Sequence, residues 1–161
     1  MGASCGGALR RAVASVGGCL VLLAAGCTST SGSADAHAAI DTAVAQASSA
    51  VATAQLTVEL LREGRVTVAV ADTSLSDQLA VLSAADHSLT GIVAPDASVR
   101  GWNEDARAAI AASGDAVLDA RSWVAHATGA PGGTQVADGL EEAALALTVV
   151  ADELDAAGSG A

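Results

Sequence analysis

The chain has 161 residues, with 18 acidic side chains against seven arginines and no lysine, tyrosine or phenylalanine. A formal net charge of −11 argues against nucleic-acid binding, because phosphate contacts need clustered lysine and arginine. An apolar fraction of 52% with a charged fraction of 16% argues against intrinsic disorder.

The first 26 residues differ in composition from the rest of the chain. Arg10 and Arg11 close a short basic segment, and an apolar run over residues 12–26 follows them. This run is too short to cross a bilayer as a helix, which takes about 20 residues. A basic start, a short apolar middle and small residues at the end are typical of a secretion signal. We therefore expect this N-terminal segment to be a cleaved export signal.

The end of the apolar run carries a more specific motif. Residues 22–27 read Leu-Leu-Ala-Ala-Gly-Cys and resemble the lipobox of bacterial lipoprotein precursors, with Ala24 where leucine is commoner. In that family the signal is cut just before the cysteine, whose thiol carries a diacylglyceryl group and whose new amino group is often acylated. The resemblance implies that Cys27 becomes the lipidated first residue of the mature protein.

Cysteine usage agrees with lipidation. Cys5 and Cys19 lie inside the segment that is removed, which leaves Cys27 as the one cysteine of the mature chain. A lone thiol is unusual in an exported protein unless it is used, and lipidation uses it. Two or three acyl chains suffice for stable anchoring, so we expect the protein at the extracytoplasmic face of the cell membrane.

Three regions are predicted after the signal. Residues 27–36 form the lipidated cysteine and a small, polar, flexible tether, which reaches at most about 30 Å. Residues 37–157 form a single domain, and residues 158–161 form a disordered tail.

Apolar residues at alternating steps of four and three predict helices throughout the domain. The first helix is expected over about residues 34–63 and ends at Gly64. Its stripe consists of Ile40, Val44, Ala47, Val51, Ala54, Val58 and Leu61.

The second helical segment begins less regularly. Alternating valines over residues 66–70 suggest a strand, but no second strand pattern exists for it to pair with, so helix or loop is favoured. Ser74 followed by Asp77 resembles a helix N-cap. Gly91 and Pro95 end the stripe that follows, which is Leu75, Leu79, Leu82, Leu89 and Val93.

Two further helices complete the predicted fold. The third opens near Asp96, a favourable N-cap residue, and carries Trp102 and Trp123 on one edge. A glycine-rich loop over residues 128–133 precedes the fourth, whose stripe is Val136, Leu140, Ala143, Leu147, Val150 and Leu154. Short connections predict an all-α, antiparallel four-helix bundle with alanine-rich seams.

Two acids fall on the apolar stripe of the second helix, where an unpaired carboxylate is costly. Asp72 and Asp86 stand seven residues to either side of Leu79. Arg107 or Arg121 of the third helix is the expected partner, and Asp72 is alternatively exposed at the edge. Interior acids also suggest a metal site, although the Glu-x-x-His pattern of di-metal bundles is absent.

The aromatic and histidine residues have two interpretations each. Trp102 and Trp123 are expected in the core, with an aromatic ligand pocket as the alternative. His37 is expected in a frayed first turn beside the tether, with a metal-binding imidazole as the alternative.

The charge pattern bears on partners. After Cys27 five arginines remain against 18 acids, for a formal charge of −13. Glu104 is spaced to pair with Arg107, whereas Asp138 and Glu142 repel at a spacing of four. A surface of this charge should repel anionic lipid and nucleic acid, which leaves the acyl chains as the membrane contact.

The sequence contains no phosphate loop, Gly-x-Ser-x-Gly, His-Glu-x-x-His or calcium-loop motif. The absence of lysine and the abundance of alanine and glycine look like small actinobacterial lipoproteins, a resemblance that is specific over residues 1–27 only. We predict a non-catalytic, lipid-anchored interaction or envelope module without a cofactor, whose partner is an unidentified envelope protein. The alternative is a lipoprotein that binds a metal ion or small ligand in the bundle interior.

Overall fold

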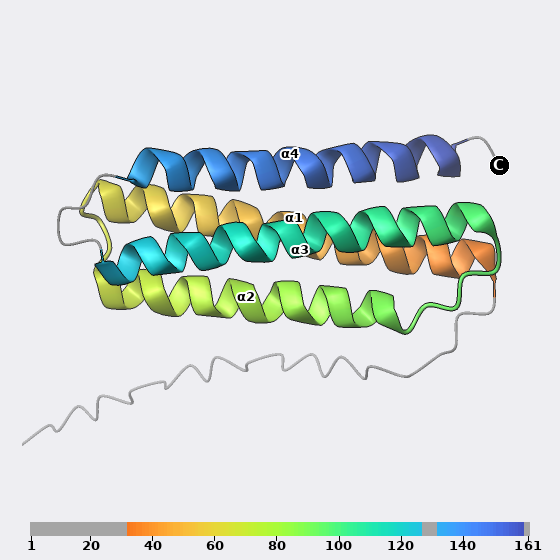
Figure 1. The fold of residues 1–161 in the computed structure, drawn as a ribbon, viewed down its shortest axis with the longest axis horizontal. Coiled ribbons are helices and arrows are strands. Elements are labelled where there is room, and N and C mark those ends of the chain that lie inside the picture. Colours follow the sequence, from red (N-terminus) through yellow and green to blue (C-terminus); the bar gives the residue numbers. More distant parts are fainter. Residues whose placement is uncertain (1–31, 127–131, 160–161) are drawn as a thin grey trace, which may run out of the picture.

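The computed structural model describes residues 32–126 and 132–159. Within them four helices follow one another (Figure 1): α1 (Ser33–Arg62), α2 (Val68–Thr90), α3 (Ala97–His126) and α4 (Gly133–Gly158). Consecutive helices run antiparallel, so the predicted all-α four-helix bundle is confirmed. The signal segment and Cys27 lie outside the described residues. No helix in the described ranges combines the length and apolarity needed to cross a bilayer.

α1 and α3 lie on the short diagonal of the bundle. Each of them contacts all three other helices, whereas α2 and α4 do not contact each other. Figure 1 shows α2 and α4 on opposite sides of the α1–α3 pair. Each of these two outer helices therefore packs against only two neighbours and leaves more of its circumference open.

The core is aliphatic and rich in alanine. Eleven of the 26 buried apolar residues in the described chain are alanines, which lets the helices approach closely, as predicted. The expected stripe of α1 is buried from Ile40 to Val58. All four helices supply the largest fully buried side chains, among them Ile40, Leu75, Leu89, Ile110, Leu140, Leu147 and Leu154.

α2 begins earlier than the sequence pattern predicts. Its N-cap is Thr67, whose hydroxyl accepts a 3.3 Å hydrogen bond from the backbone N–H of Val70. The predicted cap formed by Ser74 and Asp77 is wrong, because both residues lie inside the helix. The Ser74 hydroxyl instead lies 2.9 Å from the Thr57 hydroxyl of α1, and so contributes to the α1–α2 contact.

Of the other helix ends, the start of α3 confirms an expectation and the start of α1 corrects one. Asp96 does cap α3, since its carboxylate accepts a 2.9 Å hydrogen bond from the backbone N–H of Val99. The tether boundary is wrong, because residues 33–36 already belong to α1 and Ala36 is fully buried. α4 ends at Gly158, the first residue of the expected tail, and residues 160–161 lie outside the described part of the chain.

Candidate functional site

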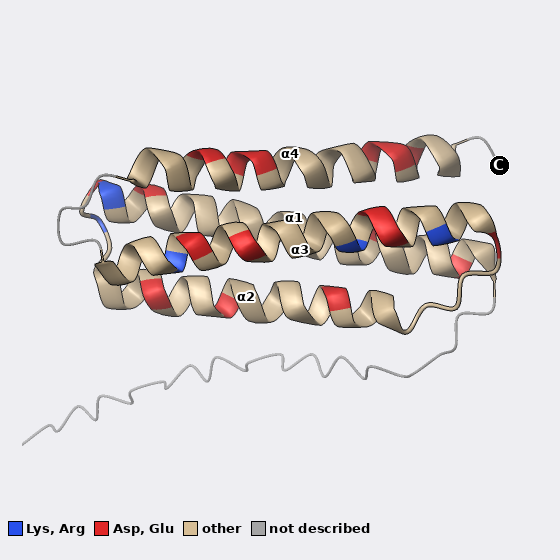
Figure 2. Cartoon of the chain, viewed as in Figure 1, with Lys and Arg blue, Asp and Glu red and all other residues tan. Residues whose placement is uncertain are grey.

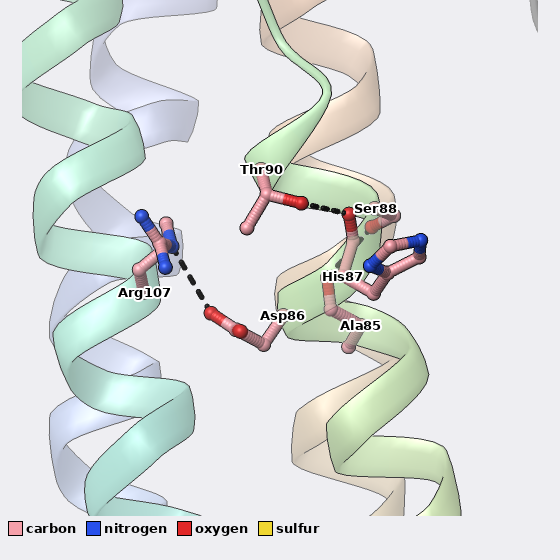
Figure 3. Close-up of polar contacts among 6 residues, drawn as sticks. All are labelled: Ala85, Asp86, His87, Ser88, Thr90 and Arg107. Atoms are coloured by element: carbon pink, nitrogen blue, oxygen red, sulfur yellow. Dashed lines mark hydrogen bonds and ion pairs between the residues drawn. The ribbon is translucent and has the colours of Figure 1, made fainter.

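Two ion pairs connect α2 with α3 along one side of the bundle. The Nε atom of Arg121 donates a 2.7 Å hydrogen bond to Oδ1 of Asp72. The Nε atom of Arg107 donates a 3.0 Å bond to Oδ1 of Asp86 (Figure 3). Both predicted partners are therefore confirmed. The expected pairing of Arg107 with Glu104 is wrong, because Arg107 crosses to α2 instead.

The two carboxylates lie at the rim of the bundle and not in its interior. The side chains of Asp72 and Asp86 are 44% and 41% exposed, so the expected seam position is wrong and exposure at the edge is correct. The hydrogen bond and positive charge of Arg121 lower the pKa of Asp72, although desolvation opposes them. The same contact with Asp72 raises the pKa of the Arg121 guanidinium.

Side-chain hydroxyls bond to backbone carbonyls in the last turns of α2, beside Asp86 (Figure 3). The Ser88 hydroxyl donates to the Ala85 carbonyl at 2.7 Å, and the Thr90 hydroxyl donates to the His87 carbonyl at 2.6 Å. The His87 ring points away from the ion pair in Figure 3. Nowhere in residues 32–126 and 132–159 do three or more His, Cys, Asp or Glu side chains gather to hold a metal ion.

His37 lies among three helices at the end of the bundle where α1 begins. Its Nε2 donates a 3.0 Å hydrogen bond to the Leu154 carbonyl of α4, which can only accept. Its ring meets Trp102 of α3 edge-on, with centroids 5.4 Å apart and planes at 88°. The expected frayed first turn is therefore wrong. The imidazole contacts α4 through its Nε2 atom and α3 through its ring.

Trp123 lies near the other end of α3. The 21 residues between the tryptophans correspond to about 30 Å of helix, so the alternative of one shared aromatic pocket is wrong. Both side chains are partly buried against the core, as the first interpretation expects. The Trp123 indole contacts Gly132 and Gly133, and its Nε1 atom is buried without a hydrogen-bond partner among the described residues.

An open groove of about 360 Å³ adjoins Trp123 between α3 and α4. Asp119, Ser122 and His126 line it from α3, and Gln135 lines it from α4. His126 is already engaged, because its Nδ1 lies 2.7 Å from the Ser122 carbonyl in the preceding turn. The remaining lining of the groove includes Ala116 and Val136.

α4 differs from the other helices in charge. It carries no basic side chain and six exposed acids, which are Asp138, Glu141, Glu142, Asp152, Glu153 and Asp155. Figure 2 shows these acids as red bands along α4 without a blue one. None of the ion pairs among the described residues involves α4.

Two large apolar side chains are exposed between these acids. Leu145 is 60% exposed and Val149 is 56% exposed. Sequence reasoning missed this pair, although the signal was available, because both residues fall outside the four-three stripe that marks the buried face of α4.

A second groove, of about 440 Å³, lies between α1 and α4. Its apolar floor includes Val58, Ala137 and Leu140, and the carboxylates of Glu59 and Glu141 line it.

Comparisons of the chain with protein-family models, with curated proteins and with solved structures give no match.

Proposed function

We propose that the protein is a lipid-anchored, non-catalytic helical module that engages another protein at the outer face of the cell membrane. The observation that carries the anchor is the lipobox-like sequence of residues 22–27, which ends in Cys27. The basic, then apolar, segment before it supplies the export signal. Acylation of the thiol and of the new amino terminus would provide the two or three chains that stable anchoring requires.

The distance along the chain from the anchor to the bundle supports a position close to the membrane. Only five residues separate Cys27 from Ser33, where α1 begins. A fully extended segment of this length reaches about 20 Å, which is shorter than the tether expected from the sequence. The formal charge of −13 after Cys27 disfavours adsorption to anionic lipid, so the bundle is held near the bilayer without lying on it.

The bundle interior favours an interaction role over the alternative of an internal metal or small-ligand site. The buried polar side chains of the described residues are Thr57 and Ser113. Their hydroxyls donate 2.8 Å bonds to backbone carbonyls one turn earlier in their own helices. The carboxylates of Asp72 and Asp86 are bound by arginines at the rim, so the residues that suggested a site in the interior are occupied elsewhere.

A fractionation experiment tests the anchor. The Cys27→Ser variant, carrying a C-terminal tag, should incorporate no labelled fatty acid and should leave the membrane fraction. The matched control is Cys19→Ser, which changes a cysteine inside the cleaved segment and should behave like the unaltered protein. Equal membrane retention and labelling of the Cys27→Ser variant would contradict the proposal.

A further inference from the structure

We infer that the outer face of α4 is the docking surface of this module, and that its partner presents a basic amphipathic helix. This "α4 surface" consists of Leu145 and Val149 with the six acids of the helix, Asp138, Glu141, Glu142, Asp152, Glu153 and Asp155. The inference rests on the interaction role proposed above and is independent of the lipid anchor.

The apolar centre of the α4 surface is contiguous. Leu145 and Val149 stand one helical turn apart on the same face, where side chains at a spacing of four contact each other. They point away from the core, which Leu147 and Val150 enter from the opposite side of the helix. α4 contacts only α1 and α3, so no helix of the described chain covers this pair.

Acids flank this apolar pair at both ends. Glu141 and Glu142 precede it and Asp152 and Glu153 follow it, so the two acidic groups lie about 15 Å apart along the helix. An apolar centre with a charged rim is the common arrangement of protein interfaces, in which the centre supplies affinity and the rim supplies orientation. The complementary surface is a helix with apolar residues one turn apart and arginine or lysine about one turn to each side.

The acids are placed where they disfavour the isolated helix. Asp138 and Glu142 repel one another at a spacing of four, and Asp152 and Asp155 do so at a spacing of three. The last two turns, which contain Asp155, hold negative charge against the negative end of the helix dipole. The acids Asp72 and Asp86 of α2, in contrast, are neutralised by arginines of α3. A cationic partner would give α4 the compensation that the described chain does not supply.

The groove between α1 and α4 extends this surface at Glu141. Its floor, which includes Val58 and Leu140, is apolar, and Glu59 and Glu141 provide carboxylates. Arg62 also lines the groove, so two carboxylates face one guanidinium there and the formal charge of the lining is −1. An apolar floor beside carboxylates fits a lysine or arginine side chain, whose methylene stem packs on carbon while its charged end meets the acids.

The charge distribution also selects among occupants. A second copy of this chain would oppose six acids with six more across an α4–α4 contact. An anionic bilayer would be repelled for the same reason. A basic amphipathic helix therefore satisfies both the apolar pair and the acids that surround it.

Peptide binding to the full-length protein purified from its host tests the surface. The probe is a fluorescent helical peptide with two leucines one turn apart and flanking arginines. Leu145→Ser with Val149→Thr, and separately Asp152→Asn with Glu153→Gln, should each weaken binding by about tenfold, or 1.4 kcal/mol. The control Leu56→Ser changes a residue that is 54% exposed on α1 and should leave affinity within about twofold.

Two control peptides identify what is recognised. Replacing the arginines of the probe with glutamate should abolish binding, and replacing its leucines with serine should weaken it by about tenfold. If the serine peptide binds as tightly as the original probe, or if the probe binds the Leu145 and Val149 variant unchanged, binding is electrostatic alone and the inference is overturned. Circular dichroism of each variant under the same conditions verifies that the helices persist.

Photocrosslinking in the native envelope separates this inference from the broader proposal. Four separate variants each carry a photocrosslinking residue at one exposed position, one position per helix: Leu56, Val81, Leu118 or Leu145. A heterologous crosslink from position 145, competed by the basic peptide, is expected. A crosslink from another helix alone would overturn the α4 surface while keeping an interaction role. No crosslink from any position would contradict both, and a homodimer from position 145 would overturn the partner class.

Discussion

The Nε2 atom of His37 donates a 3.0 Å hydrogen bond to the Leu154 carbonyl, which joins the first helix of the bundle to the last across 117 positions of sequence. The ring also meets Trp102 edge-on, with centroids 5.4 Å apart. A Cβ added to Gly158 would lie 3.6 Å from Cε1 of the same ring, so the imidazole is enclosed by α1, α3 and α4. This contact fixes the end of α1 that follows the proposed anchor.

Replacing His37 with alanine should therefore destabilise the bundle. The loss of one part-buried hydrogen bond and one aromatic contact should cost about 1–2 kcal/mol of unfolding free energy. Urea denaturation followed by circular dichroism measures this difference. His87→Ala is the matched control, because the His87 ring is exposed on α2, and it should change stability by less than about 0.5 kcal/mol. Equal effects of the two substitutions would contradict the assigned role of His37.

The ion pair of Asp72 with Arg121 predicts a pH dependence. A pKa of Asp72 that is lower in the folded protein means that folding favours the ionised carboxylate. Its contribution is present above about pH 4 and is lost as the pH falls through the lowered pKa. Asp72→Asn should therefore lower the melting temperature at pH 7 and have less effect at pH 3. Asp77→Asn, at an exposed α2 residue outside the ion pairs of the described chain, should not reproduce this difference.

The entry to α4 depends on Gly132. Its φ of 144° lies in a region that residues with a side chain rarely adopt. A Cβ added to the neighbouring Gly133 would lie 3.1 Å from Cζ2 of Trp123, which is a tight contact. Gly132→Ala should cost about 1–3 kcal/mol of stability. Gly101→Ala, inside α3 with no atom within 4 Å of an added Cβ, should instead stabilise by about 0.5–1 kcal/mol. Chemical denaturation of both variants should show opposite signs.

Neutralising the last acids of α4 should stabilise the isolated protein. Asp152→Asn, Glu153→Gln and Asp155→Asn remove repulsion and an unfavourable helix-dipole interaction, so together they should add about 1 kcal/mol at low salt. The gain should shrink in high salt as charges are screened. Asp35→Asn gives the opposite control, because Asp35 lies in the first turn of α1, where negative charge is favourable. A loss of stability in the triple variant would show that these acids are compensated within the chain.

Periodicity was sufficient to predict the helices because each one buries most of its apolar stripe, although Leu79 is only partly buried and Val93 lies beyond α2 and is exposed. The same periodicity predicted that Asp72 and Asp86 are more deeply buried than they are. The buried row of α2 runs through Ala71, Leu75 and Leu82, and the acids occupy the adjacent row. A straight helix drifts by about 20° per heptad, so extending a stripe moves it onto the edge of the packed face. The arginine partners could still be named, because a half-buried acid requires a cation from the neighbouring helix.

Long-range contacts could not be predicted from local patterns. Nothing near His37 in the sequence indicates that its ring reaches Leu154, because that contact depends on the antiparallel arrangement of α1 and α4. The start of α2 was missed because serine is the stronger N-cap residue, so local sequence favours Ser74 over Thr67, the N-cap of the folded helix. The exposed pair on α4 could have been found, since Leu145 and Val149 stand opposite the predicted stripe.

Intact-mass analysis of the protein extracted from membranes of its host tests the central claim most directly. We expect a chain that begins at Cys27, with a mass raised by a diacylglyceryl group and, where the amino terminus is acylated, by one further acyl chain. A chain that keeps residues 1–26, or one that begins near Cys27 with no added lipid mass, would contradict it.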